Sequence, residues 1–192
     1  MKAIVAVDKN WGIGKDGNLL IKISEDMKRF KNITYNNAVI MGRKTMESLG
    51  YEPLPHRLNI VLTRNYELYY PGFIYAHNKK ELMGYLNYHN IMDRSFVIGG
   101  GEIYKLLLPE CSSVIVTKIS ESFNADTYFP NLDNMKEWYK GFTDVLHYEN
   151  GIRFTYINYV NISHIISTIE KTSNRDLSEW QKHFLSKTLK EA

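Results

Sequence analysis

Residues 38–50 read AVIMGRKTMESLG, and this order of residue types decides the fold class. The four apolar residues at its start are typical of a strand that is buried on both faces. Gly42 follows, a short helical segment comes next, and Gly50 ends it. A buried strand that leads through glycine into a helix is a unit of a parallel α/β sheet. Backbone N–H groups at such a helix start bind anions, and the cationic Arg43 and Lys44 stand beside them.

The same alternation continues on both sides of this segment. Apolar runs predict further strands at residues 3–7, 58–62, 96–98 and 114–119. Amphipathic runs predict helices at residues 24–33 and 79–88. A glycine run at 99–101 joins a buried strand to a helix start and predicts a second anion site. Asn150-Gly151 is a strong turn signal between strands at 142–148 and 152–160. The sequence therefore predicts an α/β protein with a mostly parallel sheet and an antiparallel edge.

Composition excludes several classes of protein. The chain has 192 residues, enough for one domain, and its 44% hydrophobic and 23% charged residues are ordinary for a globular protein. The net charge of +3 comes without a long Lys/Arg run, so neither a nucleic-acid face nor a membrane surface is expected. Cys111 is the single cysteine, which excludes an internal disulfide and a cysteine-based metal cluster. We therefore expect no metal site. We also expect a cytoplasmic protein, because neither a signal peptide nor a membrane span is visible.

One carboxylate in the helix expected from Ser24, the predicted N-cap, has an unusual position. At 100° per residue Asp26 shares a face with Phe30 and Ile33, while Lys28 lies on the opposite side. A carboxylate on an apolar face lines a pocket or joins a buried network, since an unpaired buried charge is costly. The alternative is a first-turn acid that touches water, and from this helix alone that second interpretation is favoured.

The segment before this helix is punctuated by glycines at 12, 14 and 17. Glycine lets a loop approach a ligand closely or move as a lid, so a long glycine-containing loop is often functional. A plain surface connection is the alternative, and the glycines alone do not exclude it.

Taken in chain order, these segments resemble the dihydrofolate reductase family. The resemblance runs from Met1 to about Val160 and is carried by Ala6, residues 12–17, Asp26, Phe30, residues 39–45, Glu47, Ser48, residues 53–55, residues 57–62, residues 98–101, Ile103, Tyr104, Thr117, Asp126, Thr127, Phe129 and Pro130. It implies a mostly parallel eight-stranded sheet with an antiparallel C-terminal hairpin, flanked by helices. It also implies that NADPH and dihydrofolate meet in a central cleft, where hydride passes to C6 of the pterin and a proton is added at N5.

The resemblance assigns a substrate side to this cleft. Asp26 would hold the pterin's amino group and N3, oriented by the Thr117 hydroxyl, and an apolar surround should raise the pKa of Asp26. Arg57 would grip a glutamate carboxylate of the folate as a planar fork. The other implied substrate contacts are Val5, Met27, Phe30, Leu49, Leu54 and Ile98. No second acid or base matches a family catalytic position, so water would supply the proton to N5. Folate analogues would bind at the same place.

The resemblance assigns a cofactor side as well. Helix starts at 42–45 and 99–104 would receive the pyrophosphate, and Thr63, Arg64 and Arg43 would take the 2′-phosphate that distinguishes NADPH. The loop at 13–19 would cover the nicotinamide, and family members join the glycines equivalent to Gly99 and Gly100 by a cis peptide. The full set of implied cofactor contacts is Ala6, Ile13, Gly14, Asn18, Leu19, Gly42, Arg43, Lys44, Thr45, Leu62, Thr63, Arg64, Gly99, Gly100, Gly101, Glu102, Ile103 and Tyr104.

Three positions depart from the family pattern. Ile21 stands where the family has a tryptophan, Ser24 where proline is common, and Glu102 beside the implied pyrophosphate site. Proton delivery and affinity for pyrimidine antifolates depend on the first of these. Two alternatives therefore stay open: a reductase of another pteridine-like or ribityl-amino substrate, and an inactive folate- or nucleotide-binding module. Arg57 argues against the other substrates, because it is useful mainly for a glutamate tail.

The tail at 161–192 lies beyond the catalytic domain of residues 1–160. Apolar residues at helical spacing predict two amphipathic helices, Ser163–Lys171 and Ser178–Lys190, joined by the polar turn 172–175. Asp176 with Glu179 makes a plausible capping box for the second helix. The apolar stripes must pack on something, so the tail is the candidate contact of a monomer or homodimer.

Overall fold

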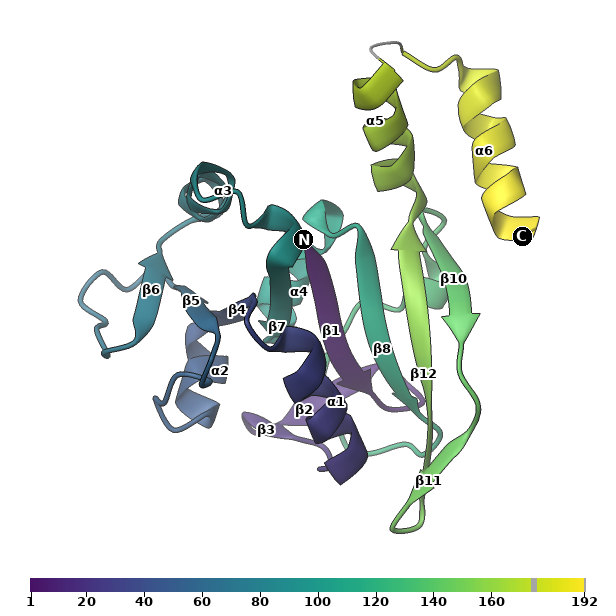
Figure 1. Ribbon diagram of the computed structural model, residues 1–192. Coiled ribbons are helices and arrows are strands. Elements are labelled where there is room, and N and C mark those ends of the chain that lie inside the picture. The colour runs from purple at the N-terminus through teal and green to yellow at the C-terminus, as the bar shows by residue number, and fades with distance from the viewer. Residues whose placement is uncertain (174–175, 192) are drawn as a thin grey trace.

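The computed structural model describes residues 1–173 and 176–191, with side chains as far as residue 188. Its main sheet has a continuous path of eight strands in the order β10-β12-β8-β1-β7-β4-β5-β6, and β11 pairs with β12 as a ninth (Figure 1). The strand bounds are β1 Lys2–Val7, β4 Ala38–Gly42, β5 Leu58–Leu62, β6 Phe73–Ala76, β7 Ser95–Gly99, β8 Ser113–Ile119, β10 Trp138–Thr143, β11 His147–Glu149 and β12 Ile152–Asn161. The strands from β8 to β6 pair in parallel, and β12 pairs antiparallel with β8, which confirms the predicted fold class.

Alternation of side chains along the strands divides the core into clusters. In β4, Ala38 and Ile40 join the largest apolar cluster, which also holds Leu82, whereas Val39 and Met41 join a second cluster. Successive side chains of a strand point to opposite faces, so the two clusters lie on the two sides of the sheet. The helices that accompany this sheet are α1 Ser24–Thr34, α2 Arg43–Ser48, α3 Lys79–Tyr88 and α4 Gly101–Leu107. There are also short 3₁₀ turns, η1 Met92–Arg94, η2 Leu108–Glu110 and η3 Leu132–Asn134.

The glycine-punctuated segment is a hairpin and not an irregular loop. β2 Gly12–Lys15 pairs with β3 Asn18–Leu19, and β9 Thr127–Tyr128 pairs with the other edge of β2. Asp126 holds this small sheet together, because its Oδ2 accepts a 2.8 Å hydrogen bond from Asp16 N. The partner segment lies far along the chain, so local sequence could not predict this pairing.

The C-terminal hairpin differs from the prediction in one respect. Its turn at Asn150 and Gly151 has positive φ at both residues, as the Asn-Gly signal predicts. The strand expected at 142–148 is instead divided, because β10 ends at Thr143 and β11 begins at His147. Within β10 the pairing with β12 also shifts register between Lys140 and Thr143.

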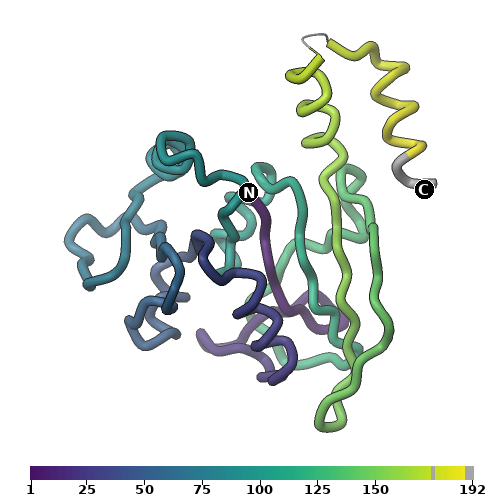
Figure 2. Tube along the Cα trace, in the orientation of Figure 1, coloured from purple at the N-terminus to yellow at the C-terminus, as the bar shows by residue number. Residues whose placement is uncertain are grey.

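The tail forms the two predicted helices, α5 Ile162–Ser173 and α6 Glu179–Glu191. β12 runs directly into α5, which extends past the end of the sheet, and α6 returns alongside it (Figure 2). The expected Asp176–Glu179 capping box is wrong: Ser178 Oγ accepts from Gln181 N at 3.2 Å, and Gln181 Oε1 accepts from Ser178 N at 2.9 Å. Residues 174 and 175 of the predicted turn, and the side chain of Leu189 on its apolar stripe, lie outside the described part.

Two properties of the described residues bear on function. No helix formed by them is both long and apolar enough to cross a membrane. Their His, Cys, Asp and Glu side chains also form no group of three or more that could hold a metal ion.

Candidate active site

Asp26 on α1 faces the sheet and meets Thr117 of β8. Thr117 Oγ1 donates a 2.5 Å hydrogen bond to Asp26 Oδ1, and the threonine is 2% exposed. Burial raises the pKa of Asp26 above its ordinary value, while the Thr117 hydrogen bond and the charge of Arg29 act in the opposite direction. Asp26 is therefore a half-buried, hydrogen-bonded carboxylate and not simply a first-turn acid in water.

The start of α1 is fixed by a residue that the sequence analysis did not find. Ile23 is the N-cap residue, and no side chain in the cap position makes a hydrogen bond, so the expected capping by Ser24 is wrong. Glu149 of β11 takes this role, because its two carboxylate oxygens accept from Ser24 N at 2.7 Å and Glu25 N at 2.9 Å. These hydrogen bonds hold the pKa of Glu149 below its ordinary value.

Further contacts hold the first turn of α1 against the hairpin. His147 Nδ1 lies 2.9 Å from Glu25 Oε1, and the Tyr156 hydroxyl donates to the same oxygen at 3.4 Å. The Arg29 guanidinium lies 4.1 Å from the centre of the Tyr156 ring. The turn signal at Asn150-Gly151 predicts the hairpin, but nothing local indicates that it docks on the helix bearing Asp26.

The apolar residues assigned to the substrate side differ in their surroundings. Val5 is 7% exposed on β1, next to the part of β8 that carries Thr117, and Phe30 is half-buried. Met27 is 44% exposed and covers Asp26 less than expected. Three others pack together in the second core cluster as half-buried side chains: Leu49, Leu54 and Ile98.

Arg57 lies at the C-terminal end of α1. Its Nε donates to Thr34 Oγ1 at 2.8 Å, Nη1 to Pro55 O at 2.7 Å and Nη2 to Lys31 O at 3.1 Å. Among the described residues these are its hydrogen-bond partners, which leaves one N–H on each terminal nitrogen for a ligand. Partial burial lowers the pKa of Arg57 from its ordinary value, although a guanidinium stays charged at neutral pH.

The starts of α2 and α4 lie next to each other, because β4 and β7, which lead into them, are parallel neighbours. A Cβ on Gly42 would come 2.7 Å from Ile103 Cγ1, and a Cβ on Gly99 would come 3.0 Å from Thr45 Oγ1. The expected cis peptide joins Gly99 and Gly100. Neither helix start has a side-chain cap, so first-turn N–H groups of both helices are available to an anion.

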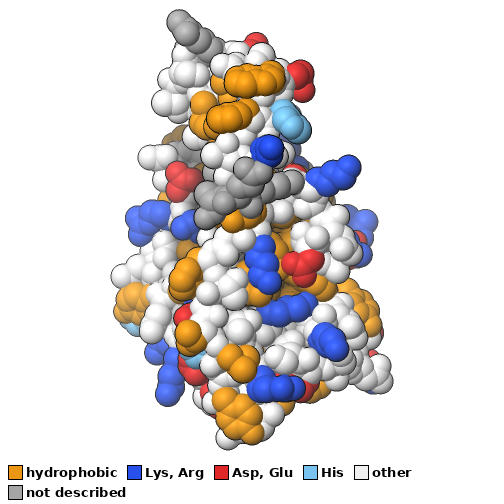
Figure 3. All heavy atoms as spheres, turned by 90° about the vertical axis from the view of Figure 1, so that its right-hand side faces the viewer, with side chains coloured by type: hydrophobic (Ala, Val, Ile, Leu, Met, Phe, Trp, Pro, Cys, Tyr) orange, Lys and Arg blue, Asp and Glu red, His pale blue; other side chains and the backbone are white. Residues whose placement is uncertain are grey.

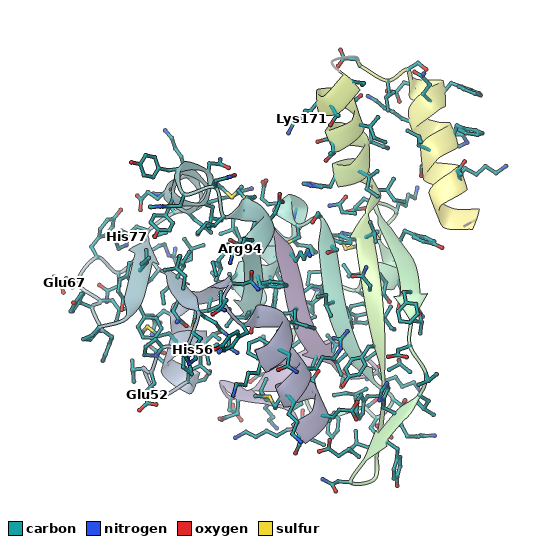
Figure 4. The ribbon with its side chains drawn as sticks, in the orientation of Figure 1. Glu52, His56, Glu67, His77, Arg94 and Lys171 are labelled. Carbon is teal, nitrogen blue, oxygen red and sulfur yellow. The ribbon has the colours of Figure 1, made fainter. Side chains whose placement is uncertain are left out.

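The residues assigned to the 2′-phosphate are partly engaged by the protein. Thr63 is 8% exposed and its Oγ1 accepts from Asn65 N at 3.1 Å, whereas Arg64 is exposed. Arg43 is also exposed, but it pairs with Glu47 one turn along α2. His77, labelled in Figure 4, lies beside this group of residues, and its Nδ1 is 3.0 Å from Thr63 O.

Other assigned cofactor residues fall into two groups. Side chains that are buried or half-buried at the ends of strands and helix starts are Ala6, Ile13, Leu62, Ile103 and Tyr104, and the Tyr104 hydroxyl is used internally, donating to Ile4 O at 2.7 Å. Residues at the surface include Lys44, Asn18 and Leu19 of the β2–β3 hairpin, and Glu102. The Glu102 side chain is 89% exposed and pairs with Lys105 at 3.2 Å, so it is directed into solvent.

Ile21, the departure from the family tryptophan, has an apolar role here. It packs as a half-buried side chain on the cluster of Ile23, Ile119, Phe154 and Tyr156. It therefore supports the segment between the β2–β3 hairpin and α1, and it offers no hydrogen bond to a ligand.

Comparison with known proteins places this chain in a family. The family model described as dihydrofolate reductase matches residues 1–161. A bifunctional dihydrofolate reductase-thymidylate synthase from Daucus carota is 37% identical, over 90% of this chain and 36% of its own length; the chain thus spans about a third of this relative. A dihydrofolate reductase from Staphylococcus haemolyticus is 38% identical over 70% of this chain and 80% of its own.

A solved structure agrees with these sequence relatives. Dihydrofolate reductase from Enterococcus faecalis, complexed with NADP(H) and RAB-propyl, superposes with a TM-score of 0.73 at 34% sequence identity. The match covers 83% of this chain and 95% of the other. The chain belongs to the dihydrofolate reductase family.

Proposed function

We propose that the chain catalyses the NADPH-dependent reduction of 7,8-dihydrofolate to 5,6,7,8-tetrahydrofolate. The observation that carries the proposal is the half-buried Asp26 carboxylate, held by the Thr117 hydroxyl at 2.5 Å. Family membership supports it, as does the NADP(H) complex of the Enterococcus faecalis relative. Tetrahydrofolate is a carrier for one-carbon metabolism, and the site would also be a target for antifolates.

On the substrate side, Asp26 would accept hydrogen bonds from the amino group and N3 of the pterin. Thr117 occupies one lone pair of Oδ1 and fixes the plane of the carboxylate, which leaves the remaining acceptor sites for the pterin. We assign the proton at N5 to water, because Asp26 is the one carboxyl that the family resemblance places at the pterin. Arg57 would bind the glutamate carboxylate through the two N–H groups that its protein partners leave available.

On the cofactor side, NADPH when bound supplies the hydride. The uncapped starts of α2 and α4 fit a pyrophosphate. A side chain at 42 would collide with Ile103, and one at 99 or 100 would crowd Thr45, so glycine at these positions leaves room. Arg64 would hold a 2′-phosphate directly, whereas Arg43 would first have to leave Glu47. The β2–β3 hairpin would shield the nicotinamide from water.

We also propose that the chain acts in the cytoplasm as a monomer or homodimer, with the tail as the candidate contact. Trp180 and Phe184 of α6 are 70% and 54% exposed and stack 5.5 Å apart. Exposed Phe142, Leu146 and Tyr148 lie on and beside the edge strands below it, and apolar side chains are spread over this face in Figure 3. Apolar surface of this kind favours a contact with a second copy.

The activity is tested by following NADPH oxidation with and without dihydrofolate. We expect oxidation that depends on dihydrofolate and yields stoichiometric tetrahydrofolate. A second arm offers dihydropteridines that lack the glutamate, and we expect them to be poor substrates because Arg57 then has no carboxylate to bind. Folate binding without NADPH oxidation would overturn the assignment in favour of a binding module. Equal rates with and without the glutamate would favour the alternative substrate class.

A further inference from the structure

Strand β11 presents two polar side chains to the first turn of α1. Side chains alternate along a strand, so His147 and Glu149 point to one face of β11, while Tyr148, which is 71% exposed, points to the other. Glu149 accepts from the first N–H groups of α1, and His147 contacts the side chain of Glu25 in the same turn. Capping explains the position of Glu149, and the position of His147 needs a separate reason.

Two aromatic contacts hold the ring of His147 in one orientation. Its register partner on β12, Phe154, stacks on it with the ring centres 5.3 Å apart and 17° between the ring planes. Tyr156 meets the same ring at 4.8 Å and 64°, which is an edge-on contact. The side chain of His147 is 22% exposed. The groups that its two nitrogens face are therefore fixed by the packing of β11 on β12.

Each nitrogen of this ring faces a carboxylate. Nδ1 lies 2.9 Å from Glu25 Oε1, and Nε2 lies 3.5 Å from Oδ2 of Asp144, which stands between β10 and β11. Nε2 is buried and makes no hydrogen bond to the described residues. A neutral imidazole donates from one nitrogen and carries a lone pair on the other, whereas the protonated ring donates from both. The arrangement suits the protonated ring, because either neutral form sets a lone pair against a carboxylate.

The other ionisable groups around the ring have further partners. From β12, the Tyr156 hydroxyl donates to Glu25 Oε1 at 3.4 Å. From α1, the Arg29 guanidinium lies 4.1 Å from the centre of the Tyr156 ring. Glu149, on β11 itself, accepts from the backbone of the first turn of α1. In the ion pairs formed by the described residues, the imidazole is the cationic partner of both Glu25 and Asp144.

The charge of Glu25 acts on Asp26, which follows it in the chain. Burial raises the pKa of Asp26 most, the Thr117 hydrogen bond and the charge of Arg29 lower it, and the charge of Glu25 raises it. Two neutral hydroxyl groups also lie near this carboxylate, those of Tyr104 on α4 and Tyr156 on β12. A cation paired with Glu25 offsets the charge of Glu25, so the protonation of the imidazole is felt at Asp26.

We propose that His147 is a positioning residue for Asp26: its protonated ring joins Glu25 to Asp144, holds the first turn of α1 and offsets the negative charge beside Asp26. The proposal rests on the proposed function, in which Asp26 binds the pterin. The imidazole acts through Glu25 and does not touch the reacting atoms. Its effect is greatest in acid, where the ring carries both protons, and it weakens as the pH rises.

The test follows the ionisation of Asp26 in two ways. One is the inflection of kcat/KM for dihydrofolate against pH, and the other is carboxyl carbon NMR, with Asp26→Asn to assign the signal. His147→Gln leaves the charge of Glu25 without its cation, so the Asp26 inflection should move to higher pH by roughly half a unit. Glu25→Gln leaves the cation without its carboxylate, so the inflection should move to lower pH.

Two further variants complete the set. Asp144→Asn removes one of the two carboxylates that favour the protonated ring, so it should shift the inflection in the same direction as His147→Gln but by less. His183→Gln is the matched control, because His183 is exposed on α6, which lies far from β11 in Figure 1. It should keep the wild-type inflection.

The direction of the shifts separates a charge effect from a structural one. An unchanged inflection in His147→Gln, or shifts of the same sign in His147→Gln and Glu25→Gln, overturns the positioning role even when dihydrofolate is reduced. Opposite shifts of the Asp26 NMR signal, without reduction of dihydrofolate, overturn the proposed activity and support the positioning role. If His147→Gln does not fold, Asp144→Asn and Glu25→Gln decide the same question.

Discussion

Glu149 accepts a 2.7 Å hydrogen bond from the backbone N–H of Ser24, across 125 residues of sequence. The contact joins the C-terminal hairpin to the first turn of the helix that carries Asp26. A carboxylate at this place satisfies N–H groups that have no partner within the helix and complements the positive end of its dipole. The hairpin therefore supports the proposed catalytic carboxylate from a distance.

Replacing Glu149 by Gln should lower the melting temperature at neutral pH. The melting temperature of the variant should also fall less steeply as the pH is lowered. The hydrogen bonds hold the pKa of Glu149 below its unfolded value of 4.5, so their contribution is present above that pH and lost as pH falls through the folded pKa. Thermal melts between about pH 3 and pH 7 measure this difference. Glu52→Gln, an exposed acid labelled in Figure 4, is the control and should behave like the wild-type protein. Parallel curves for both variants would contradict the capping role.

Asp26→Asn should reduce kcat far more than it reduces stability. Burial raises the pKa of Asp26, which means that the ionised carboxylate is disfavoured in the folded protein and its removal relieves a desolvation cost. Loss of a charged group aimed at the reacting ring should cost about a hundredfold or more in kcat. Steady-state kinetics and melts on the same preparation test both parts. Turnover near the wild-type rate at neutral pH would remove Asp26 from the proposed mechanism.

Thr117→Val should move the pH profile without abolishing activity. The Thr117 hydrogen bond favours the ionised form of Asp26, so its loss should raise the pKa of Asp26 further. The inflection of kcat/KM assigned to Asp26 should therefore shift to higher pH, and it should be missing in Asp26→Asn. An inflection that stays in place in Thr117→Val would show that another group titrates.

The sequence predicts local features well and distant contacts poorly. Apolar runs predict the strands, and the Asn150-Gly151 pair predicts the turn of the hairpin. The glycines at 99–101 indicate a helix start. The Asp26–Thr117 contact follows from the family resemblance, because residues on one helix and one remote strand share no local pattern. The capping by Glu149 could not be predicted for the same physical reason: Glu149 and Ser24 are 125 residues apart, and no local pattern connects them.

The tail illustrates the same limit at short range. Helical spacing of the apolar residues predicts both helices to within two residues at each end. The capping residue is wrong by two positions, since Asp176-x-x-Glu179 and Ser178-x-x-Gln181 both fit the capping-box pattern. Only the position of the first helical turn decides between them.

Cofactor preference should depend more on Arg64 than on Arg43. Two charge-assisted contacts of about 1.5–3 kcal/mol each would favour NADPH over NADH by roughly a hundredfold or more. Arg43 already pairs with Glu47, so part of its gain on binding a phosphate is offset by loss of that pair. Arg64→Gln should lower the ratio of kcat/KM values more than Arg43→Gln does. Equal kcat/KM for the two cofactors in the wild-type chain would show that these residues face elsewhere.

Two truncations of the tail should have different effects. Ending the chain after Asn161 removes Ile162, which is 3% exposed and whose N–H donates to Glu137 O at 2.8 Å. Loss of this buried residue and of the half-buried side chains of α5 should lower the melting temperature by about 5 °C or more. Ending it after Ser173 removes α6 with its exposed Trp180 and Phe184, so assembly size should change more than stability. Hydride transfer should persist in both, because the proposed site precedes residue 161. Light scattering and melts of the two proteins decide between the roles, and identical size and stability in all forms would mean that the tail contacts something outside this chain.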